Sequence, residues 1–569
     1  MHYAELAKAR DELTGPGGAF EIVHIDVNGI ALRAYRHALP DVRALWQSTL
    51  PFADRTYLVY RDERLTYAEA HAHVDAIAAW LAAQGVQPGD RVAIAMRNYP
   101  EWLLIYWACV STGIAVVGMN AWWTAEEMAY ALADSAPKAM FLDAERLDRY
   151  REIADPMAGV TLVGVRLRKP EPAVTSFADI VAHGGAMPEV AIDPDADACI
   201  FYTSGTTGFP KGAQLTHRGC ITNLFNMLYA GASTALAVQR ATGVEPPASA
   251  PVPVSLLTTP LFHVTANNCG AYATTAAGGT IVLMYRWDAG EALQIIAQER
   301  VTSIGGVPVM ARELINHPDF AATDVSSLTA MSGGGAQVPP DLVHKIEAKV
   351  ASARPSTGYG MTETCGIITS VSGDFFVDKP DSAGPAMPSY EAKCVDDAGN
   401  TVPLGEIGEL WVRGAAVIKG YINRPEATAA AITDGWLHTG DIARIDEDSF
   451  IFIVDRKKDM VLRGGENVYC AEVEAAIYRH PAIAECCVFG VPDHRLGEEV
   501  GVAIVLKPGE PLDEGALRSF CGGLIAPYKV PRHIWFMTEP LPRNASGKFL
   551  RRDLRDGLSK DLPKAAEQP

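Results

Sequence analysis

The chain lacks any regular arrangement of cysteines. Its 569 residues include ten cysteines but no C-x-x-C pair, and the two that are adjacent are Cys486 and Cys487. Such spacing indicates neither a disulfide framework nor a zinc site. Scattered cysteines of this kind are typical of a protein that folds in a reducing compartment, so we expect a cytoplasmic location.

Basic residues are scarce relative to acidic ones. Lysine and arginine number 49 against 68 aspartates and glutamates, which gives a net charge of −19. This surplus of negative charge disfavours general binding to nucleic acid or to an anionic membrane surface. A polyanionic ligand would therefore have to be held locally, by a few lysines and by loop amides. The sequence leaves a homodimer open.

Apolar runs long enough to cross a membrane are also scarce. The uncharged run 102–123 approaches that length, but it is interrupted by polar and small residues such as Ser111, Gly113 and Asn120. We expect a buried helix, a turn and a buried strand there, and no integral membrane segment. The amino terminus, MHYAELAKARDELTGPGG, has no apolar core before a cleavage site, so we expect no secretory signal.

What the chain does have is an alternation of helix and strand patterns. Residues 66–84 begin with Thr66 and Glu69 as a capping box and show helical spacing, and a short apolar strand follows at 91–96. The alternation continues with nearly all-apolar strands, which indicates parallel sheets that are covered on both faces. We therefore predict an α/β fold with a large N-terminal domain of doubly wound mixed sheets.

Later segments depart from this pattern. Residues 390–454 contain short alternating strands and turns, which predict a small antiparallel β unit. Since the chain exceeds what one hydrophobic core organises, we expect an N-terminal domain at 1–457 and a small α+β C-terminal domain at 458–569. The segment 231–254 is rich in Ala, Ser and Pro, and we interpret it as a surface loop of unassigned role.

The densest phosphate-binding chemistry is the segment YTSGTTGFPKG at residues 202–212. It combines hydroxyls, glycines and Lys211 at the end of an apolar strand, where parallel sheets bind ligands. Such a composition favours a loop that wraps backbone amides around phosphate oxygens. It is not a Walker loop, because that spacing requires a glycine at Pro210 and a hydroxyl at Gly212.

Two glycine-flanked motifs carry groups suited to a nucleotide. TGYGMTET, at 357–364, supplies an aromatic ring, hydroxyls and Glu363, which can stack on a base, bond a phosphate and hold magnesium. SGGGA, at 332–336, offers bare backbone against which a flat ring can lie. Taken alone, each motif could equally be a structural turn.

Two further motifs add charge. WLHTGD ends in Asp441, whose carboxylate is suited to a bidentate grip on ribose hydroxyls. NASGKFLRRDL, at 544–554, sets Lys548 on a glycine turn ahead of a basic helix, where it could reach a reacting phosphate. A turn and a solvated face are the structural alternatives.

Six motifs, in this order and at these separations, resemble those of the adenylate-forming superfamily of acyl-CoA synthetases, adenylation domains and luciferases: YTSGTTGFPKG, GYGMTET, WLHTGD, DRKKDM, RGGENVY and NASGKFLRRDL. The resemblance extends over about residues 45–555. The resemblance implies that a carboxylic acid and MgATP react to form an acyl-adenylate and pyrophosphate. The acyl group would then pass to a thiol. We therefore expect ATP, Mg²⁺ and the co-substrate CoA.

The resemblance also implies roles for individual residues. It assigns nucleotide binding to Thr203, Ser204, Gly205, Thr206, Thr207, Gly208, Lys211, Gly334, Gly335, Ala336, Tyr359, Gly360, Met361, Thr362, Asp441 and Arg456. Within that set, the loop and Lys211 would hold the β and γ phosphates, Tyr359 would sandwich adenine, and Asp441 with Arg456 would hold the ribose. Catalysis would rest on Lys548, which bridges substrate carboxylate and α-phosphate, with Glu363 and Thr206 placing magnesium.

A mobile C-terminal domain follows from the same resemblance. Lys458, in DRKKDM, matches the position of the hinge about which this domain turns between the two half-reactions. After the turn, Lys548 would leave the site. A loop formed by Arg463, Gly464, Gly465 and Glu466 would then face it and open a channel for the thiol of CoA.

The acyl pocket is implied at His263, Gly305, Gly306 and Gly334. Amino-acid-activating relatives usually carry an Asp near an aromatic residue of this region, whereas here Phe262 is followed by His263, so an amino acid substrate is disfavoured. The glycines would leave a roomy pocket, which suits a fatty acid or a flat aryl acid.

We therefore predict an ATP-dependent carboxylic acid–CoA ligase that acts on a medium- or long-chain fatty acid. An aryl or aryl-alkanoic acid is the first alternative substrate. A free-standing adenylation protein that loads a carrier protein is a second alternative, and a non-catalytic nucleotide-binding relative is a third. One residue departs from the family pattern: Ser449 replaces a glycine, at a small cost if its φ is positive.

Overall fold

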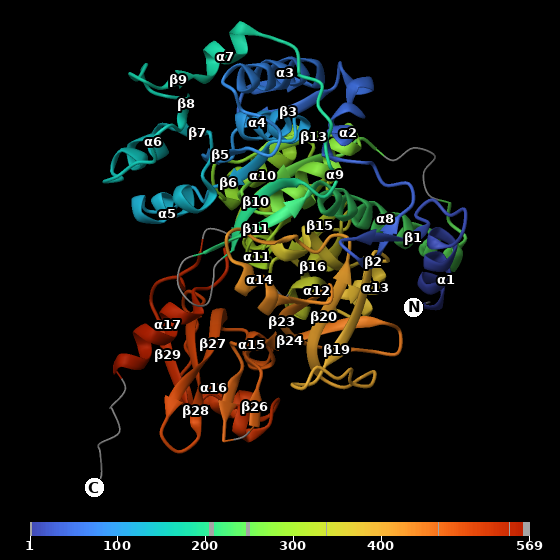
Figure 1. Ribbon diagram of the computed structural model, residues 1–569. Coiled ribbons are helices and arrows are strands. Elements are labelled where there is room, and N and C mark those ends of the chain that lie inside the picture. The colour runs from blue at the N-terminus through green and yellow to red at the C-terminus, as the bar shows by residue number, and fades with distance from the viewer. Residues whose placement is uncertain are drawn as a thin grey trace.

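The computed structural model of the protein describes residues 3–203, 210–245, 251–336, 338–464, 466–544 and 547–561. A large body built from the N-terminal and middle parts of the chain carries a smaller C-terminal body, drawn in orange and red in Figure 1. Among the described helices, none is long and apolar enough to span a bilayer.

The first sheet has the strand order β21-β11-β10-β6-β5-β7-β8-β9. Pairing is parallel from β10 to β9, and β11 and β21 are antiparallel additions. The strands are β5 (Arg91–Ala95), β6 (Ala115–Gly118), β7 (Ala139–Asp143), β8 (Thr161–Val165), β9 (Thr175–Ser176), β10 (Asp197–Thr203), β11 (Lys211–Thr216) and β21 (Gly420–Tyr421). The helices of this part are α3 (Tyr67–Ala83), α4 (Pro100–Ser111), α5 (Ala125–Ser135), α6 (Ala144–Arg151), α7 (Phe177–His183) and α8 (His217–Thr242).

The second sheet has the order β17-β16-β15-β14-β12-β13-β3-β4, parallel except at its two edges. Its strands are β3 (Thr56–Tyr60), β4 (Glu63–Thr66), β12 (Val254–Leu257), β13 (Thr280–Leu283), β14 (Ser303–Gly306), β15 (Ala330–Gly334), β16 (Arg354–Met361) and β17 (Gly366–Ser372). Its helices are α9 (Tyr272–Ala276), α10 (Ala289–Glu299), α11 (Pro308–Asn316), α12 (Pro340–Lys349) and α13 (Asp374–Asp378). One hydrophobic core joins the sheets, with Ile94 and Phe141 from the first and Tyr57 and Ile281 from the second. The predicted α/β fold of doubly wound mixed sheets is confirmed.

A third, antiparallel sheet forms the small β unit expected near 390–454. Its strands are β18 (Gly384–Pro385), β19 (Tyr390–Val395), β20 (Gly408–Gly414), β22 (Ile432–Thr433), β23 (Trp436–Ile445) and β24 (Phe450–Arg456), and α14 (Pro425–Ala431) lies beside them. Ser449, in the turn before β24, has a φ of 65°. The serine thus adopts the left-handed conformation that the glycine of the family pattern would tolerate more easily.

The C-terminal body contains its own sheet and its own hydrophobic core. Its elements are β25 (Val461–Arg463), β26 (Glu466–Val468), α15 (Cys470–Tyr478), β27 (Ile483–Asp493), β28 (Gly497–Leu506), α16 (Glu514–Gly522), β29 (His533–Met537) and α17 (Arg551–Leu558). The boundary that we predict at 457 and 458 falls in the short connection between β24 and β25. That this connection acts as a hinge stays a prediction.

At the N-terminus, α1 (Tyr3–Thr14), the hairpin β1 (Ile22–Val27) and β2 (Ile30–Tyr35), and α2 (Val42–Gln47) precede the first sheet. One prediction in the large domain is wrong. The segment 231–254 was expected to be a surface loop, but its first half continues α8 as far as Thr242, where Gly243 caps the helix in the left-handed conformation. The Ala-rich composition explains this difference, because alanine is the strongest helix former.

Candidate active site

The strand ends of the large domain bring several expected site residues to one region. Thr203 ends β10 and Lys211 begins β11, and these two residues are paired across the sheet. Ser204, Gly205, Thr206, Thr207 and Gly208 lie outside the described residues. Lys211 therefore marks where the chain rejoins the sheet after the segment expected to bind phosphate.

Glu363 lies at the end of β16, in the short turn Thr362–Thr364, and its residue is 9% exposed. Its Oε1 accepts a hydrogen bond of 2.8 Å from the hydroxyl of Tyr421, on β21. The ammonium of Lys211 lies 4.6 Å from the centre of the same Tyr421 ring. One aromatic side chain thus touches a carboxylate and a cation of the expected phosphate site. Sequence reasoning missed Tyr421, because KGYINRPEAT offers no phosphate-binding pattern.

The expected ribose and adenine residues form a second group. The Tyr359 hydroxyl donates to Oδ2 of Asp441 at 2.6 Å, and Arg456 Nε lies 3.2 Å from Oδ1 of the same carboxylate. Asp441 and Arg456 face each other across β23 and β24. Burial, and then Asp441, raises the pKa of Tyr359, so the phenol stays protonated and keeps donating.

Glycines open the space beside Tyr359. Gly335 and Ala336 line the same cleft as Tyr359, and Gly334 ends the neighbouring strand β15. Gly360 permits a close backbone approach, since a Cβ there would lie 1.9 Å from the carbonyl oxygen of Gly366. Met361 and Thr362 follow directly, at the end of β16.

Lys548 comes from the C-terminal body and reaches this group. A Cβ on Gly335 would lie 3.5 Å from Lys548 Cε. Burial, and then Arg456, lowers the pKa of Lys548 to about 8, while Asp441 and Glu363 oppose the shift. The structure therefore brings Lys548 into the cleft that Asp441 and Tyr359 also line, although these residues are far apart in the sequence.

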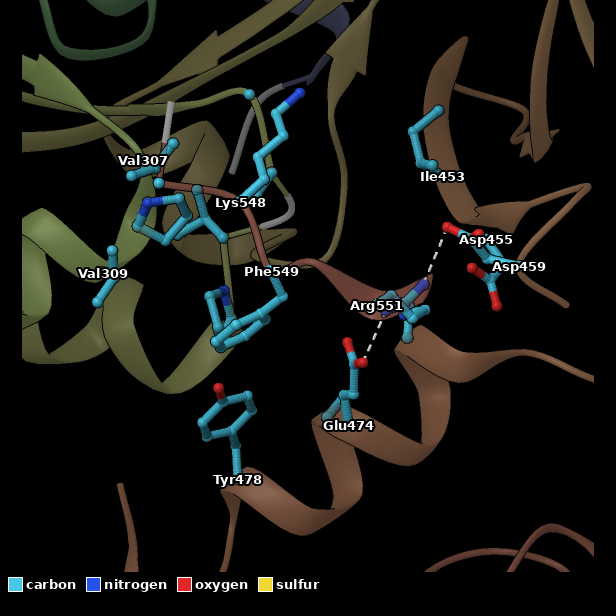
Figure 2. Close-up of a pocket in the computed structure, with 18 of the residues that line it drawn as sticks. Val307, Val309, Ile453, Asp455, Asp459, Glu474, Tyr478, Lys548, Phe549 and Arg551 are labelled. Carbon is cyan, nitrogen blue, oxygen red and sulfur yellow. Dashed lines mark hydrogen bonds and ion pairs between the residues drawn. The ribbon is translucent and has the colours of Figure 1, made fainter. Parts of the chain in front are cut away.

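The cleft between the two bodies has a volume of about 1410 Å³. Figure 2 shows its lining, with Lys548 near Val307 and with Arg551 between Glu474 and Asp459. Arg551 Nη2 lies 2.7 Å from Glu474 Oε1 and Nη1 lies 3.1 Å from Asp459 Oδ2. Arg551 begins α17, three positions after Lys548, and Asp459 directly follows Lys458. This ion-pair network was not predicted, since its partners are distant in the sequence.

Asp455 lies beside this network, on the other side of the expected hinge. Its carboxylate accepts from the backbone N–H of Arg456 at 2.7 Å and from that of Cys470. Burial raises the pKa of Asp455 to about 6, against an opposing effect of Arg551. The last strand of the large domain is thus bonded to the first residue of α15.

The expected acyl-pocket residues lie at the ends of neighbouring strands. Gly305 is open, with Ser332 Cβ 3.8 Å from an added Cβ, whereas Gly306 is packed against Met310 Sδ and Thr258 Oγ1 at 2.7 and 2.8 Å. Gly306 therefore leaves no room for a side chain. His263 has a buried Nε2 that finds no hydrogen-bond partner among the described residues, and burial lowers its pKa to about 4, with Lys548 as a second cause. The imidazole is neutral at physiological pH.

The residues expected at a CoA channel lie apart from Lys548. Arg463 is paired with Glu499, its Nε 2.7 Å from Oε2, and Gly464 donates to Leu496 O at 2.7 Å. Glu466 is exposed on β26, and Gly465 lies outside the described residues. In this arrangement the described residues of the loop do not line the cleft that holds Lys548.

The described residues fit a magnesium ion that takes one carboxylate from the protein and most of its other ligands from phosphates and water. Glu363 offers one buried carboxylate that Tyr421 orients. Within the described ranges, no three His, Cys, Asp or Glu side chains form a dedicated metal cluster. Mg²⁺ is usually bound in this way, through one or two carboxylates together with phosphates and water.

Comparison with known proteins agrees with this geometry. The sequence model of the AMP-binding enzymes matches residues 45–422, and that of the AMP-binding enzyme C-terminal domain matches residues 472–548. A feruloyl-CoA synthase from Amycolatopsis is 36% identical, over 86% of this chain and 93% of its own. The long-chain-fatty-acid–CoA ligase FadD13 of Mycobacterium tuberculosis is 34% identical, over 88% and 95%.

A solved structure agrees as well. ATP-bound MatB from Rhodopseudomonas palustris superimposes with a TM-score of 0.78 at 30% identity, covering 90% of this chain and 98% of that one. The chain therefore belongs to the family of AMP-binding enzymes and is an AMP-forming acid–CoA ligase.

Proposed function

We propose that this ligase joins a medium- or long-chain fatty acid to CoA in two steps, with Lys548 serving the first step alone. The observation that carries this proposal is the position of Lys548, which comes from the C-terminal body and lines the same cleft as Asp441 and Arg456 of the large domain. In the first step the acid attacks the α-phosphorus of ATP, an acyl–phosphate bond forms, and pyrophosphate leaves. In the second step the CoA thiol replaces AMP.

The role of Lys548 follows from charge. A carboxylate that attacks a polyphosphate brings like charges together, so a cation at the point of attack stabilises the transition state. With a pKa of about 8, Lys548 is mostly protonated at neutral pH and can donate to the substrate carboxylate and to the α-phosphate. Lys211 is suited to hold the departing phosphates, because it borders the phosphate loop.

Other residues would hold the nucleotide in register. Asp441 is already fixed by Tyr359 and Arg456, so its remaining lone pairs can accept from the ribose hydroxyls. Glu363 would hold Mg²⁺, which when bound neutralises phosphate charge. Thr206, the second expected ligand, lies outside the described residues.

A change of domain orientation would separate the two steps. Lys458 is the proposed hinge, since it stands between Asp455, which lies on the large domain's last strand and accepts from Cys470 of α15, and Asp459, which is paired with Arg551. Turning about this point would withdraw Lys548 and bring the loop Arg463, Gly464, Gly465 and Glu466 to the site.

The choice of a fatty acid as the substrate is the most specific part of the proposal. The described side chains around Gly305 and Gly306 are Thr258, Met310 and Ser332, and none of them is charged. His263 is neutral, so the acyl side offers no partner for a second charged group on the acid. Relatives that include FadD13 carry the name of long-chain-fatty-acid–CoA ligases.

An aryl acid is the second candidate. It is favoured by the relative from Amycolatopsis, whose name is feruloyl-CoA synthase and whose identity is 36%. The open position at Gly305 beside a packed Gly306 would also accept a flat ring.

A panel of acids tests both candidates. Pyrophosphate release is measured with saturated fatty acids of increasing length and with cinnamic-type and benzoic acids, each with and without CoA. The proposal expects the highest kcat/KM for a medium or long fatty acid, together with a CoA thioester as product. A higher kcat/KM for aryl acids would show that the substrate is an aryl acid and not a fatty acid. Adenylation without thioester would favour loading of a carrier protein, and no pyrophosphate release with any acid would favour a non-catalytic relative.

A further inference from the structure

The short strand β21 links two parts of the expected phosphate site. Its Tyr421 is paired with Ala213 on β11, and the N–H of Ile422 donates to Gly212 O at 2.9 Å. The strand is thereby fixed to the residues that directly follow Lys211. A Cβ on Gly212 would lie 2.8 Å from Ile422 Cγ2, so the two segments are in close contact.

The same segment is also bonded to Glu363. The Tyr421 hydroxyl donates to Glu363 Oε1 at 2.8 Å, and the backbone N–H of Ile418 donates to Glu363 O at 3.0 Å. Tyr421 is 8% exposed, so this phenol–carboxylate bond is shielded from water. A hydrogen bond to a buried charged group both strengthens and orients that group.

We propose that Tyr421 is the positioning residue for the metal-binding carboxylate of Glu363. By occupying Oε1, its hydroxyl fixes the rotation of the carboxylate and leaves Oε2 for the metal. The face of the Tyr421 ring lies 4.6 Å from Lys211 Nζ and would keep this ammonium beside the departing phosphates of ATP. This inference rests on the proposed function, in which Glu363 holds Mg²⁺ and Lys211 holds the departing phosphates.

The chain offers a matched control in Tyr390. Its hydroxyl is also buried and donates at 3.0 Å to the backbone oxygen of Thr364, the residue next to Glu363. Tyr390→Phe therefore removes a phenol hydroxyl that bonds to the same turn and leaves the Glu363 carboxylate untouched. Loss of packing or of turn stability would affect both variants, whereas loss of carboxylate orientation affects only Tyr421→Phe.

The experiment measures Mn²⁺ binding in the presence of ATP, by the change in water proton relaxation when Mn²⁺–ATP binds to the protein, with Mn²⁺–ATP alone as the baseline. We expect about a tenfold weaker Kd for Mn²⁺ in Tyr421→Phe and a wild-type Kd in Tyr390→Phe. In a Glu363→Gln background, Tyr421→Phe should add no further loss, because the hydroxyl acts through that carboxylate. Thermal unfolding checks that each variant is folded.

Several results would overturn the inference. A folded Tyr421→Phe with wild-type Mn²⁺ affinity would do so, as would independent, additive losses from Glu363→Gln and Tyr421→Phe. If Tyr421→Phe does not fold, the variant Tyr421→His can replace it, because histidine keeps a ring with a hydrogen-bond donor. A Mn²⁺ affinity of Tyr421→His as low as that of Glu363→Gln would then contradict the inference. A Mn²⁺ affinity between those of Glu363→Gln and the wild type would support the inference. Absence of Mn²⁺–ATP binding by the wild-type protein would instead refute the proposed function.

Discussion

Gly547 lies against Val307 so closely that a Cβ on the glycine would be 2.7 Å from Val307 Cγ2. Gly547 also has a φ of 82°, which side-chain-bearing residues rarely adopt. Val307 caps α11 directly after Gly306, at the edge of the expected acyl pocket. The glycine before Lys548 is therefore one point where the C-terminal body meets the edge of the expected acyl pocket.

Gly547→Ala should displace Lys548 and slow adenylation. The added methyl group cannot be accommodated without moving the backbone, and a misplaced cation loses much of its effect on the transition state. We expect ATP–pyrophosphate exchange to fall on the order of a hundredfold, while thioester formation from supplied acyl-adenylate is unchanged. Gly557→Ala is the control, because among the described residues nothing outside its own helical turn lies within 4 Å of a Cβ at that position. Equal loss in both half-reactions would show that Gly547 serves folding only.

Adenylation should depend on pH through Lys548. The ammonium is the active form, and burial lowers its pKa to about 8, so kcat/KM for ATP should fall as the pH rises through about 8. Below that pH the group is charged and the rate should be level with respect to this residue. Lys548→Arg, although slower, should lose the decline, since arginine stays protonated. A decline that persists in Lys548→Arg would assign it to another group.

Arg551→Met should weaken the C-terminal domain and the first half-reaction. It leaves Glu474 and Asp459 without their shared partner, and because these side chains are partly exposed we expect a loss of about 2 kcal/mol in the free energy of unfolding. Lys548 stands three residues away, so pyrophosphate exchange should decline more than thioester formation.

The comparison for Arg551 is Arg552→Met, which breaks an exposed pair with Asp556 in the same helix. Its effect on unfolding and on both half-reactions should be small. Similar loss of exchange in the two arginine variants would mean that Arg551 has no particular connection to Lys548.

Lys458→Pro should impair thioester formation and spare adenylation, which is the opposite of the effect expected for Gly547→Ala. Within the described residues, the Lys458 N–H makes no hydrogen bond, so proline removes none, but it restricts the backbone where the domain would turn. We expect adenylation to persist and thioester formation to fall at least tenfold, measured in separate assays. Lys457→Ala is a useful comparison, because Lys457 is paired with Glu409 and does not occupy the hinge. Parallel loss of both activities in Lys458→Pro would argue against a hinge at this position.

The sequence predicted much of the large domain because local signals and tertiary structure agree there. The capping box at Thr66 and Glu69 forms as expected, and apolar runs such as 91–96 become buried parallel strands. The prediction for 231–254 failed because the helix propensity of alanine decides the first half, which extends α8; the proline-rich part lies partly outside the described residues.

The candidate site divides in the same way. Motifs predicted roles for Lys548, Asp441 and Glu363, since each carries its own chemistry within a few residues, and these roles stay predictions. The sequence did not indicate Tyr421 because its contact with Glu363 depends on an edge strand that pairs with β11, some two hundred residues earlier. The network of Arg551 was missed for a related reason, because its partners come from the hinge segment and from α15.

The most direct test of the two-step account is Lys548→Ala, assayed separately for ATP–pyrophosphate exchange and for thioester formation from purified acyl-adenylate and CoA. Removing the only cation proposed at the attacking carboxylate should lower exchange a hundredfold or more. Thioester formation should stay within about twofold of wild type, because Lys548 is withdrawn in that step. Exchange near the wild-type rate in a folded Lys548→Ala protein would contradict the account.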